Sequence, residues 1–216
     1  MYGYAPVKAK VLAVRIIPNV DDAMKKALAL SPEHRSIGMM TVTIDDVGYT
    51  AVDEATKKAR VQVVYAKSFY AGSAHASGPL SGEFIGILAG PDPAEVESGL
   101  NAAVFFAENE AAFFAADPEG QIAFYAHCVS RTGSYLSSAA GIPEGAPLAY
   151  LIAPPLEAMF GLDAALKAAN VRMASFFGPP SETNFGGGLL TGTQADCQAA
   201  CDAFASAVMD VASRPR

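Results

Sequence analysis

Residues 53–61 read DEATKKARV, and residues 163–171 read DAALKAANV, 110 positions further along the chain. Five of the nine positions are identical, with Asp, Ala, Lys, Ala and Val at 53, 55, 57, 59 and 61 and again at 163, 165, 167, 169 and 171. Each stretch is predicted to be a helix that leads into a strand. Such a repeat is typical of a chain in which one structural unit occurs twice.

The sequences that follow the two helices also correspond, although the offset between them changes. After each helix we expect a strand, a glycine-rich loop, a second strand and a long helix. Gly86 and Gly90 match Gly188 and Gly192 at an offset of 102. The change of offset falls in the loops, which tolerate changes of length better than a core does. We therefore predict two tandem domains of the α+β class, sandwich-like in arrangement, at residues 1–112 and 113–216.

The predicted elements follow the same order in both halves. In the first half, helices are expected at 20–30, 50–60 and 94–112, and strands at 9–18, 36–44, 61–66 and 83–89. In the second half, helices are expected at 156–169 and 194–212, and strands at 121–130, 147–153, 171–177 and 188–192. Thr50 and Asp53 have the spacing of a capping box. This spacing predicts that the helix begins at Thr50 and that Asp45 and Asp46 lie in the preceding turn.

The composition limits the classes of partner. The chain has a net charge of −7, and its 15 basic residues are scattered. This argues against nucleic acid, which requires a concentrated cationic face. No window approaches 18 continuous apolar residues, so no membrane span is expected, and the N-terminus lacks the apolar core of a signal peptide. Three cysteines do not form a disulfide framework. We expect a protein of the reducing cytoplasm.

Carboxylates mark the turn before the repeated helix in both halves. Asp45 and Asp46 precede it in the first half, and Glu157 lies at the matching turn in the second. A functional interpretation is a small acidic pocket for an amine or a metal ion. The alternative is ordinary turn chemistry, with acids placed favourably at a helix N-terminus.

Other stretches give weaker signals for chemistry. Gly186, Gly187 and Gly188 are followed by a predicted strand rather than a helix, so a mobile loop is favoured over a phosphate cradle. Cys197 and Cys201 share a face of a predicted helix, where small buried hydrophobes are commoner than a zinc site. We therefore predict no catalytic residue, no metal site and no cofactor.

Four long stretches resemble the EutL family, the ethanolamine-utilisation shell proteins of bacterial microcompartments. They are IDDVGYTAVDEATKKARVQVVYAKSFYAG from residue 44, HCVSRTGSYLSSAAGI from 127, AYLIAPPLEAMFGLDAALKAA from 149 and PPSETNFGGGLLTGTQADCQAACDAF from 179. The resemblance implies two tandem, circularly permuted shell domains. It also implies a homotrimer in which six half-chains mimic a hexamer, and a shell, made with other microcompartment shell proteins, that lies in the cytoplasm.

The same resemblance assigns roles to particular residues. In the family a central pore opens or closes through loop movement, and the matching positions here lie in the 67–81 and 176–187 loops and at residue 113. The implied gate residues are Phe69, Tyr70, Phe113, Phe177 and Asn184. From sequence alone, the aromatic residues among them could equally belong to the core.

The family also has a small acidic opening that binds the amine substrate, and Asp45, Asp46 and Glu157 match it. The leading hypothesis is a non-enzymatic shell subunit with a gated pore for metabolites or cofactors. One alternative is a trimeric binding module for a small amine such as ethanolamine, or for a cobalamin-type ligand, that does not tile. Another is an enzyme that uses His127, Ser130 or Asp45.

Overall fold

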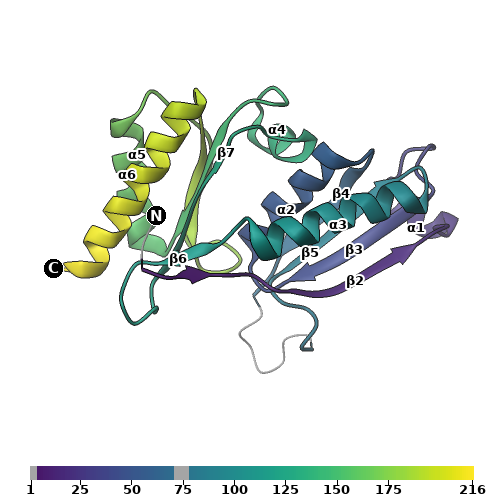
Figure 1. The fold of residues 1–216 in the computed structure, drawn as a ribbon, viewed down its shortest axis with the longest axis horizontal. Coiled ribbons are helices and arrows are strands. Elements are labelled where there is room, and N and C mark those ends of the chain that lie inside the picture. Colours follow the sequence, from purple (N-terminus) through teal and green to yellow (C-terminus); the bar gives the residue numbers. More distant parts are fainter. Residues whose placement is uncertain (1–3, 71–77) are drawn as a thin grey trace. The chain divides into compact units, whose positions relative to one another are not determined.

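The computed structural model describes residues 4–70 and 78–216 and divides into two compact units (Figure 1). The N-terminal unit consists of Lys8–Ala111 together with Gly133–Leu136. The C-terminal unit consists of residues 4–7, Ala112–Thr132 and Ser137–Arg216. The expected domain bounds were 1–112 and 113–216. Residues 4–7 nevertheless pack with the second half of the sequence, and Gly133–Leu136 packs with the first half.

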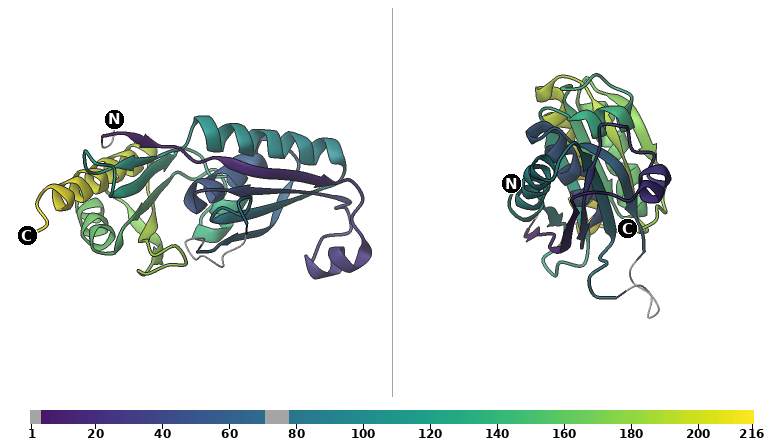
Figure 2. Two further views of the ribbon diagram at one scale, coloured as in Figure 1. Left: turned by 90° about the horizontal axis from the view of Figure 1, so that it is seen from below. Right: turned by 90° about the vertical axis from the view of Figure 1, so that its right-hand side faces the viewer.

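The N-terminal unit is a four-stranded antiparallel sheet with two helices on one face. The strand order is β2 (Val11–Ile17), β3 (Ser36–Val42), β5 (Phe84–Gly90) and β4 (Gln62–Ser68). Helices α2 (Asp45–Lys58) and α3 (Pro93–Asn109) pack on each other and on this sheet. The short helix α1 (Asp22–Ala27) lies beyond the end of β2 and has no buried residue (Figure 2).

The C-terminal unit repeats this arrangement and extends the sheet. Strands β7 (Ala123–Val129), β8 (Leu148–Ala153), β10 (Gly186–Thr191) and β9 (Arg172–Phe177) are continued by β6 (Phe113–Ala115) and β1 (Pro6–Val7). Helices α5 (Pro155–Ala168) and α6 (Gln194–Ser213) lie side by side and contact this sheet. Helix α4 (Ser134–Ala140) follows β7, as α1 follows β2.

The predicted duplication is confirmed by the positions of the elements. α2 and α5 begin and end 110 residues apart, as do the starts of β4 and β9. β5 and β10 begin 102 residues apart. The two helices also end in the same backbone conformation, since Ala59 has φ −143° and ψ 161°, and Ala169 has φ −142° and ψ 158°. Both units therefore have one fold, with the sheet order β2-β3-β5-β4 matched by β7-β8-β10-β9.

The predicted start of the first repeated helix is wrong. Helix α2 begins at Asp45, so the supposed turn is its first helical turn. The hydroxyl of Thr50 donates to the carbonyl oxygens of Asp46 and Val47 within the helix, so Thr50 is not the N-cap residue. Acids in a first helical turn are stabilised by the helix dipole, and this explains how α2 begins without a side-chain cap at Ile44.

The glycine run at 186–188 is also not the expected loop, because it forms buried strand β10. A Cβ at Gly187 would lie 1.9 Å from the carbonyl oxygen of Leu151 in the neighbouring strand. The absence of a side chain is therefore what allows β8 and β10 to pair at this point. Three short elements were not predicted, namely β1, β6 and α4.

The core of the C-terminal unit lies between its sheet and α5 and α6. It includes Phe124, Leu151 and Leu190 from the sheet, and Ala165 and Phe204 from the helices. Among the helices in the described part of the chain, none combines the length and apolarity needed to cross a membrane.

Candidate functional site

Asp45 and Asp46 lie in the first turn of α2, and each is only 7% exposed. The backbone N–H of Asp46 donates to the carboxylate of Asp45 at 3.0 Å, which fixes the orientation of that carboxylate. The turn packs closely against β5, because a Cβ at Gly48 would lie 2.3 Å from the ring of Phe84. The repeated fold therefore holds two adjacent carboxylates at a defined, largely buried position.

Two further polar residues adjoin this acidic pair. Burial raises the pKa of Glu83, and the charge of Asp45 adds to that shift. Burial also raises the pKa of Tyr49, and the charges of Asp45 and Asp46 add to the effect against the opposing hydrogen bonds from Ser68. The Tyr49 hydroxyl lies 3.0 Å from the Ser68 hydroxyl and accepts the Ser68 N–H at 2.9 Å. Asp45, Asp46, Glu83 and Tyr49 form what we call the acidic site.

Glu83 and Tyr49 were not predicted as site residues. Tyr49 stands four residues after Asp45, a spacing that places the two on one helix face once the helix is known to start at Asp45. The misplaced helix start concealed that relation. Glu83 was assigned only as the first residue of a strand. The pairing of β3 with β5, with Val42 opposite Phe84, brings this position beside α2.

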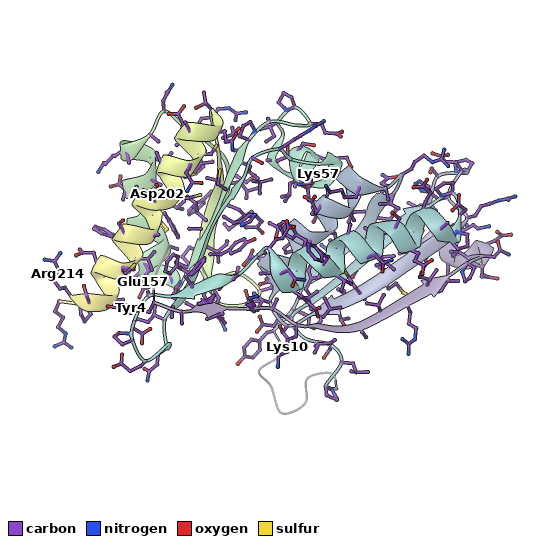
Figure 3. All side chains as sticks on the ribbon, in the orientation of Figure 1. Tyr4, Lys10, Lys57, Glu157, Asp202 and Arg214 are labelled. Carbon is purple, nitrogen blue, oxygen red and sulfur yellow. The ribbon has the colours of Figure 1, made fainter. Side chains whose placement is uncertain are left out.

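Glu157 lies in the first turn of α5, where it is partly buried in the C-terminal unit (Figure 3). Its counterpart at the same helix position is Val47, which is fully buried. Because Glu157 and the acidic pair belong to different units, their joint action remains a prediction.

Two of the predicted gate residues belong to an aromatic cluster in the C-terminal unit. Phe113 is 4% exposed and stacks on Tyr125, with ring centroids 5.1 Å apart. Its edge also meets Phe185 at 6.1 Å. Tyr125 contacts Tyr150, which in turn lies 6.3 Å from Phe177. In this structure, Phe113 therefore has the surroundings of a core residue.

The other gate residues lie in exposed connections. Phe69 and Tyr70 follow β4, and Tyr70 is 57% exposed. Asn184 has a φ of 68° and forms a tight turn in which its N–H donates to the carbonyl of Ser181. Part of the expected 67–81 gate loop, residues 71–77, lies outside the described residues.

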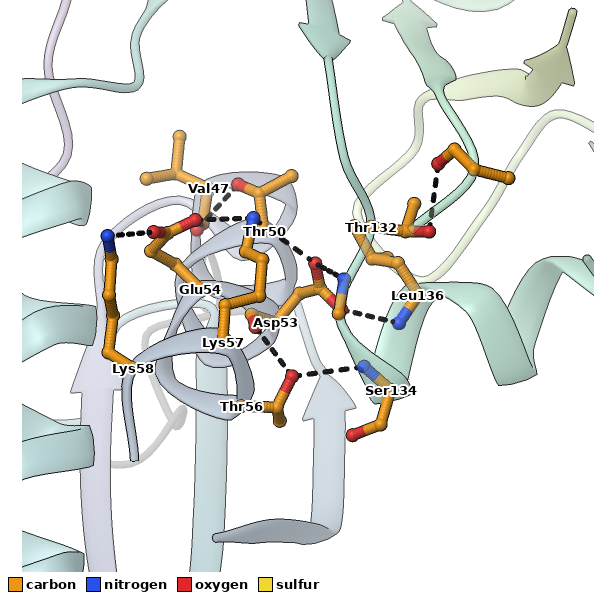
Figure 4. A network of polar contacts seen from close by, with 12 residues as sticks. Val47, Thr50, Asp53, Glu54, Thr56, Lys57, Lys58, Thr132, Ser134 and Leu136 are labelled. Carbon is orange, nitrogen blue, oxygen red and sulfur yellow. Dashed lines mark hydrogen bonds and ion pairs between the residues drawn. The ribbon is translucent and has the colours of Figure 1, made fainter. Parts of the chain in front are cut away.

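Asp53 on α2 is a buried carboxylate that accepts hydrogen bonds from a distant segment of the chain (Figure 4). It is fully buried and accepts the N–H groups of Gly133 and Leu136, both at 2.8 Å. The Ser134 N–H donates to the hydroxyl of Thr56 one turn later. Burial raises the pKa of Asp53, while the two N–H donors and Lys57 at 3.7 Å oppose that shift. Asp53 therefore caps backbone N–H groups of the segment Gly133–Leu136 and not those of its own helix α2.

The cysteines lie in apolar surroundings. Cys197 and Cys201 are fully buried in the core of the C-terminal unit, and burial raises the pKa of both thiols. Burial also raises the pKa of Cys128 to about 11. Over residues 4–70 and 78–216, no cluster of three or more His, Cys, Asp or Glu side chains is arranged to hold a metal ion. A raised pKa favours the protonated thiol at neutral pH, which is the less nucleophilic form.

Comparison with known proteins places these features in a family. The profile of the BMC domain matches residues 36–116. The microcompartment shell protein EutL of Clostridium perfringens (strain 13 / Type A) is 61% identical over 97% of this chain and 96% of its own length. EutL of Salmonella typhimurium (strain LT2) is 54% identical over 97% of this chain and 95% of its own length.

A solved structure agrees with the sequence comparison. The crystal structure of ethanolamine utilization protein EutL from Leptotrichia buccalis matches with a TM-score of 0.96 and 67% identity. The match covers 100% of this chain and 99% of that chain. Shell proteins of this kind are structural, so the expectation of a protein that is not an enzyme is confirmed. The chain belongs to the EutL family of bacterial microcompartment shell proteins.

Proposed function

We propose that the chain forms a homotrimer that tiles with other shell proteins into flat facets. The observation that carries this proposal is the presence of two units with the same fold in one chain. Three such chains supply six similar units, enough to close a ring like that of a hexamer. A ring of six similar units also has a central axis, on which a pore can form.

The residues proposed to gate that pore are Phe69, Tyr70 and Asn184 in connections, together with Phe113 at the start of β6 and Phe177 at the end of β9. Support comes from the exposed position of Tyr70 and from the tight turn at Asn184, since both lie in connections rather than in the sheet. Movement of these connections would change the width of the pore without unfolding either sheet. Small metabolites, or a larger ligand of the cobalamin type, would pass when it is open.

The acidic site is proposed to bind a small primary amine such as ethanolamine, with Glu157 as a further ligand. Support comes from Asp45, Asp46 and Glu83, three carboxylates in partly or largely buried surroundings, two of which influence each other electrostatically. An ammonium group would relieve that repulsion, and the attraction is stronger at a partly buried site than in water. The Tyr49 hydroxyl and the carboxylates also offer acceptors for the hydroxyl of ethanolamine.

Assembly is tested by light scattering of the purified chain at micromolar concentration. The proposal predicts a single species of three times the chain mass of 22.3 kDa. A monodisperse species of 22.3 kDa would contradict it.

Amine binding is tested by calorimetric titration of ethanolamine into the wild-type protein and two variants. Asp46→Asn is expected to weaken binding at least about tenfold, because one charge–charge interaction near a protein surface is worth more than 1.4 kcal/mol. The matched control is Asp202→Asn, which removes an exposed carboxylate on α6. Equal affinities for all three proteins would exclude the acidic site as the amine site.

A further inference from the structure

A cavity of about 370 Å³ lies in the C-terminal unit, and none of its lining residues belongs to the acidic site or to the predicted gate. Its walls come from three segments, namely the connection after α4, the connection between α5 and β9, and the end of β10. Sites for small organic molecules typically have volumes of about 300–1,000 Å³. The cavity is therefore large enough for a ligand of a few carbon atoms.

Hydrogen bonds and close packing fix the walls of this cavity. The Thr191 hydroxyl donates to the carbonyl oxygen of Pro147 at 2.8 Å, which joins the end of β10 to the connection after α4. The Asn170 N–H donates to the Asp196 carboxylate at 3.3 Å, which joins the connection between α5 and β9 to the first turn of α6. A Cβ at Gly192 would lie 2.8 Å from the carbonyl oxygen of Asn170, so glycine permits the close approach of these two segments. Because the walls are held in this way, binding requires little further ordering of the protein.

The lining combines one cation with apolar surface. Arg172 at the start of β9 is exposed, and its guanidinium forms no ion pair or hydrogen bond with any of the described residues. Asn170 is also exposed and adds a side-chain amide that can donate. The apolar part of the lining comes from Ile142, Pro143 and Val171. This combination suits a molecule with one anionic end and a short hydrocarbon chain.

The carboxylate of Asp196 limits the negative charge that the cavity can accept. One of its oxygens accepts the Asn170 N–H, and the other accepts the Thr193 hydroxyl at 2.6 Å. The hydrogen bond from Thr193 lowers the pKa of Asp196, so this carboxylate is charged at neutral pH. A phosphate dianion would bring a second negative charge close to Asp196, whereas a carboxylate matches the single charge and the planar shape of the Arg172 guanidinium. The charges therefore favour a monocarboxylate.

The matching connection of the N-terminal unit has a different lining. At the offsets of 110 and 102 that relate the two repeats, Gln62 takes the place of Arg172, and Ala89 that of Thr191. The connection carries an exposed arginine, Arg60, but at the position of Asn170. Arg60 therefore offers a matched control, since it has the same charge in the equivalent connection without the lining of the cavity.

We propose that this cavity binds a small monocarboxylate, with the carboxylate paired to the Arg172 guanidinium and the alkyl chain against Ile142 and Val171. The side-chain amide of Asn170 donates to the same carboxylate. The inference does not depend on the proposed trimer or on amine binding. All residues of the cavity lie in the C-terminal unit, whereas the acidic site lies in the N-terminal unit.

The first test is calorimetric titration of butyrate into the wild-type protein, Arg172→Gln and the control Arg60→Gln. We expect saturable binding to the wild type and binding at least about tenfold weaker to Arg172→Gln, because that variant loses the charge-assisted pair with the carboxylate. Arg60→Gln is expected to bind butyrate as tightly as the wild type. The inference would be overturned by a wild type that does not bind, by equal affinities of all three proteins, or by an equal loss in both variants.

The second test uses the wild-type protein alone, so it does not depend on the folding of a variant. Butyramide, the neutral analogue, is expected to bind at least about tenfold more weakly than butyrate, and inorganic phosphate is expected not to displace butyrate. Phosphate that binds more tightly than butyrate would contradict the assignment of a carboxylate.

Amide hydrogen exchange of the wild type locates the bound butyrate. At a saturating concentration, exchange is expected to slow at residues 170–172 and 191–192 and to stay unchanged at the matching residues 60–62. Slowing only outside the first two ranges would place butyrate elsewhere and overturn the inference.

Discussion

The two units share a fold but differ at matching positions in ways that separate their roles. In the N-terminal unit, Asp46 and Asp53 on α2 are buried, and Glu83 lies beside the start of that helix. In the C-terminal unit the same three positions hold Leu156, Asp163 and Phe185, of which Leu156 and Asp163 are exposed. The N-terminal unit therefore carries an acidic site, and the C-terminal unit carries an aromatic cluster and a solvent-exposed face of α5.

This difference shows that position in a repeat determines backbone conformation but not environment. Asp53 and Asp163 are identical residues on equivalent helices, yet only Asp53 accepts hydrogen bonds from a second segment. Duplication supplies two copies of each surface, and the chain uses one copy internally. The second copy can therefore differ in exposure and in residue type, as at Asp163 and Phe185.

The largest effect is expected for Asp53→Ala compared with Asp163→Ala. Loss of Asp53 leaves the buried N–H groups of Gly133 and Leu136 without an acceptor, and two charge-assisted hydrogen bonds make this worth about 4 kcal/mol of unfolding free energy. Loss of the exposed Asp163–Lys167 pair is expected to cost about 0.4 kcal/mol. Urea unfolding of both variants at one protein concentration measures the difference.

Amide hydrogen exchange provides the local readout for this pair of variants. Asp53→Ala should accelerate exchange at Gly133 and Leu136, and Asp163→Ala should leave both amides protected. Equal destabilisation by the two substitutions would contradict the assigned difference between the helices.

A slightly smaller effect is expected for Gly187→Ala compared with Gly86→Ala. A Cβ at Gly187 would lie 1.9 Å from the backbone oxygen of Leu151, which the pairing of β8 and β10 holds in place. The nearest atom at Gly86 is the Cγ1 of Val52 at 2.8 Å, a side chain that can move. We expect a loss of about 3 kcal/mol for Gly187→Ala and about 1 kcal/mol for Gly86→Ala. Thermal unfolding distinguishes them, and a reversed order would disprove the explanation.

The smallest effect concerns the acidic site, which the C-terminal unit lacks. Burial and the charge of Asp45 raise the pKa of Glu83 above its ordinary value of 4.5, so the folded protein binds this proton more tightly than the unfolded chain does. The contribution of Glu83 to stability is therefore greatest below that value and declines as the pH rises through it toward the raised pKa. Glu83→Gln should remove the decline and increase stability near neutral pH by about 0.5 kcal/mol.

Urea unfolding of Glu83→Gln and wild type across the acidic range checks this prediction. The difference between the two proteins should grow with rising pH and then level off. A difference that does not depend on pH would show that Glu83 has an ordinary pKa in the folded protein.

Much of the fold could be predicted from the sequence because the two halves of the chain can be compared with each other. The identities shared by residues 53–61 and 163–171 lie on matched helices, and the glycines at 86 and 188 lie on matched strands. Strands β1 and β6 were missed because two and three residues are too few to show an alternating pattern. Helix α4 was missed because, unlike its counterpart α1, it has no acidic residue in its first turn to mark its start. The run at 186–188 was misassigned because the close approach of Leu151 that requires glycine is a tertiary contact.

The acidic site was predicted only in part. Asp45 and Asp46 stood out as adjacent acids before a helix, whereas Glu83 enters the site through the pairing of β3 with β5. The role of Asp53 could not be foreseen, because its hydrogen-bond donors are 80 and 83 residues away in the sequence. Residues joined by long-range contacts leave no local pattern in the sequence. The apparent capping box at Thr50 is a local pattern, but it led to the wrong helix start.

The central claim, that two copies of one fold build a tile of six similar units, is tested most directly by electron microscopy of concentrated, negatively stained protein. The account predicts flat arrays whose repeating particle has six lobes of two alternating kinds, corresponding to the two units of three chains. Particles that stay separate at every concentration, or arrays whose repeating particle lacks three-fold symmetry, would contradict it.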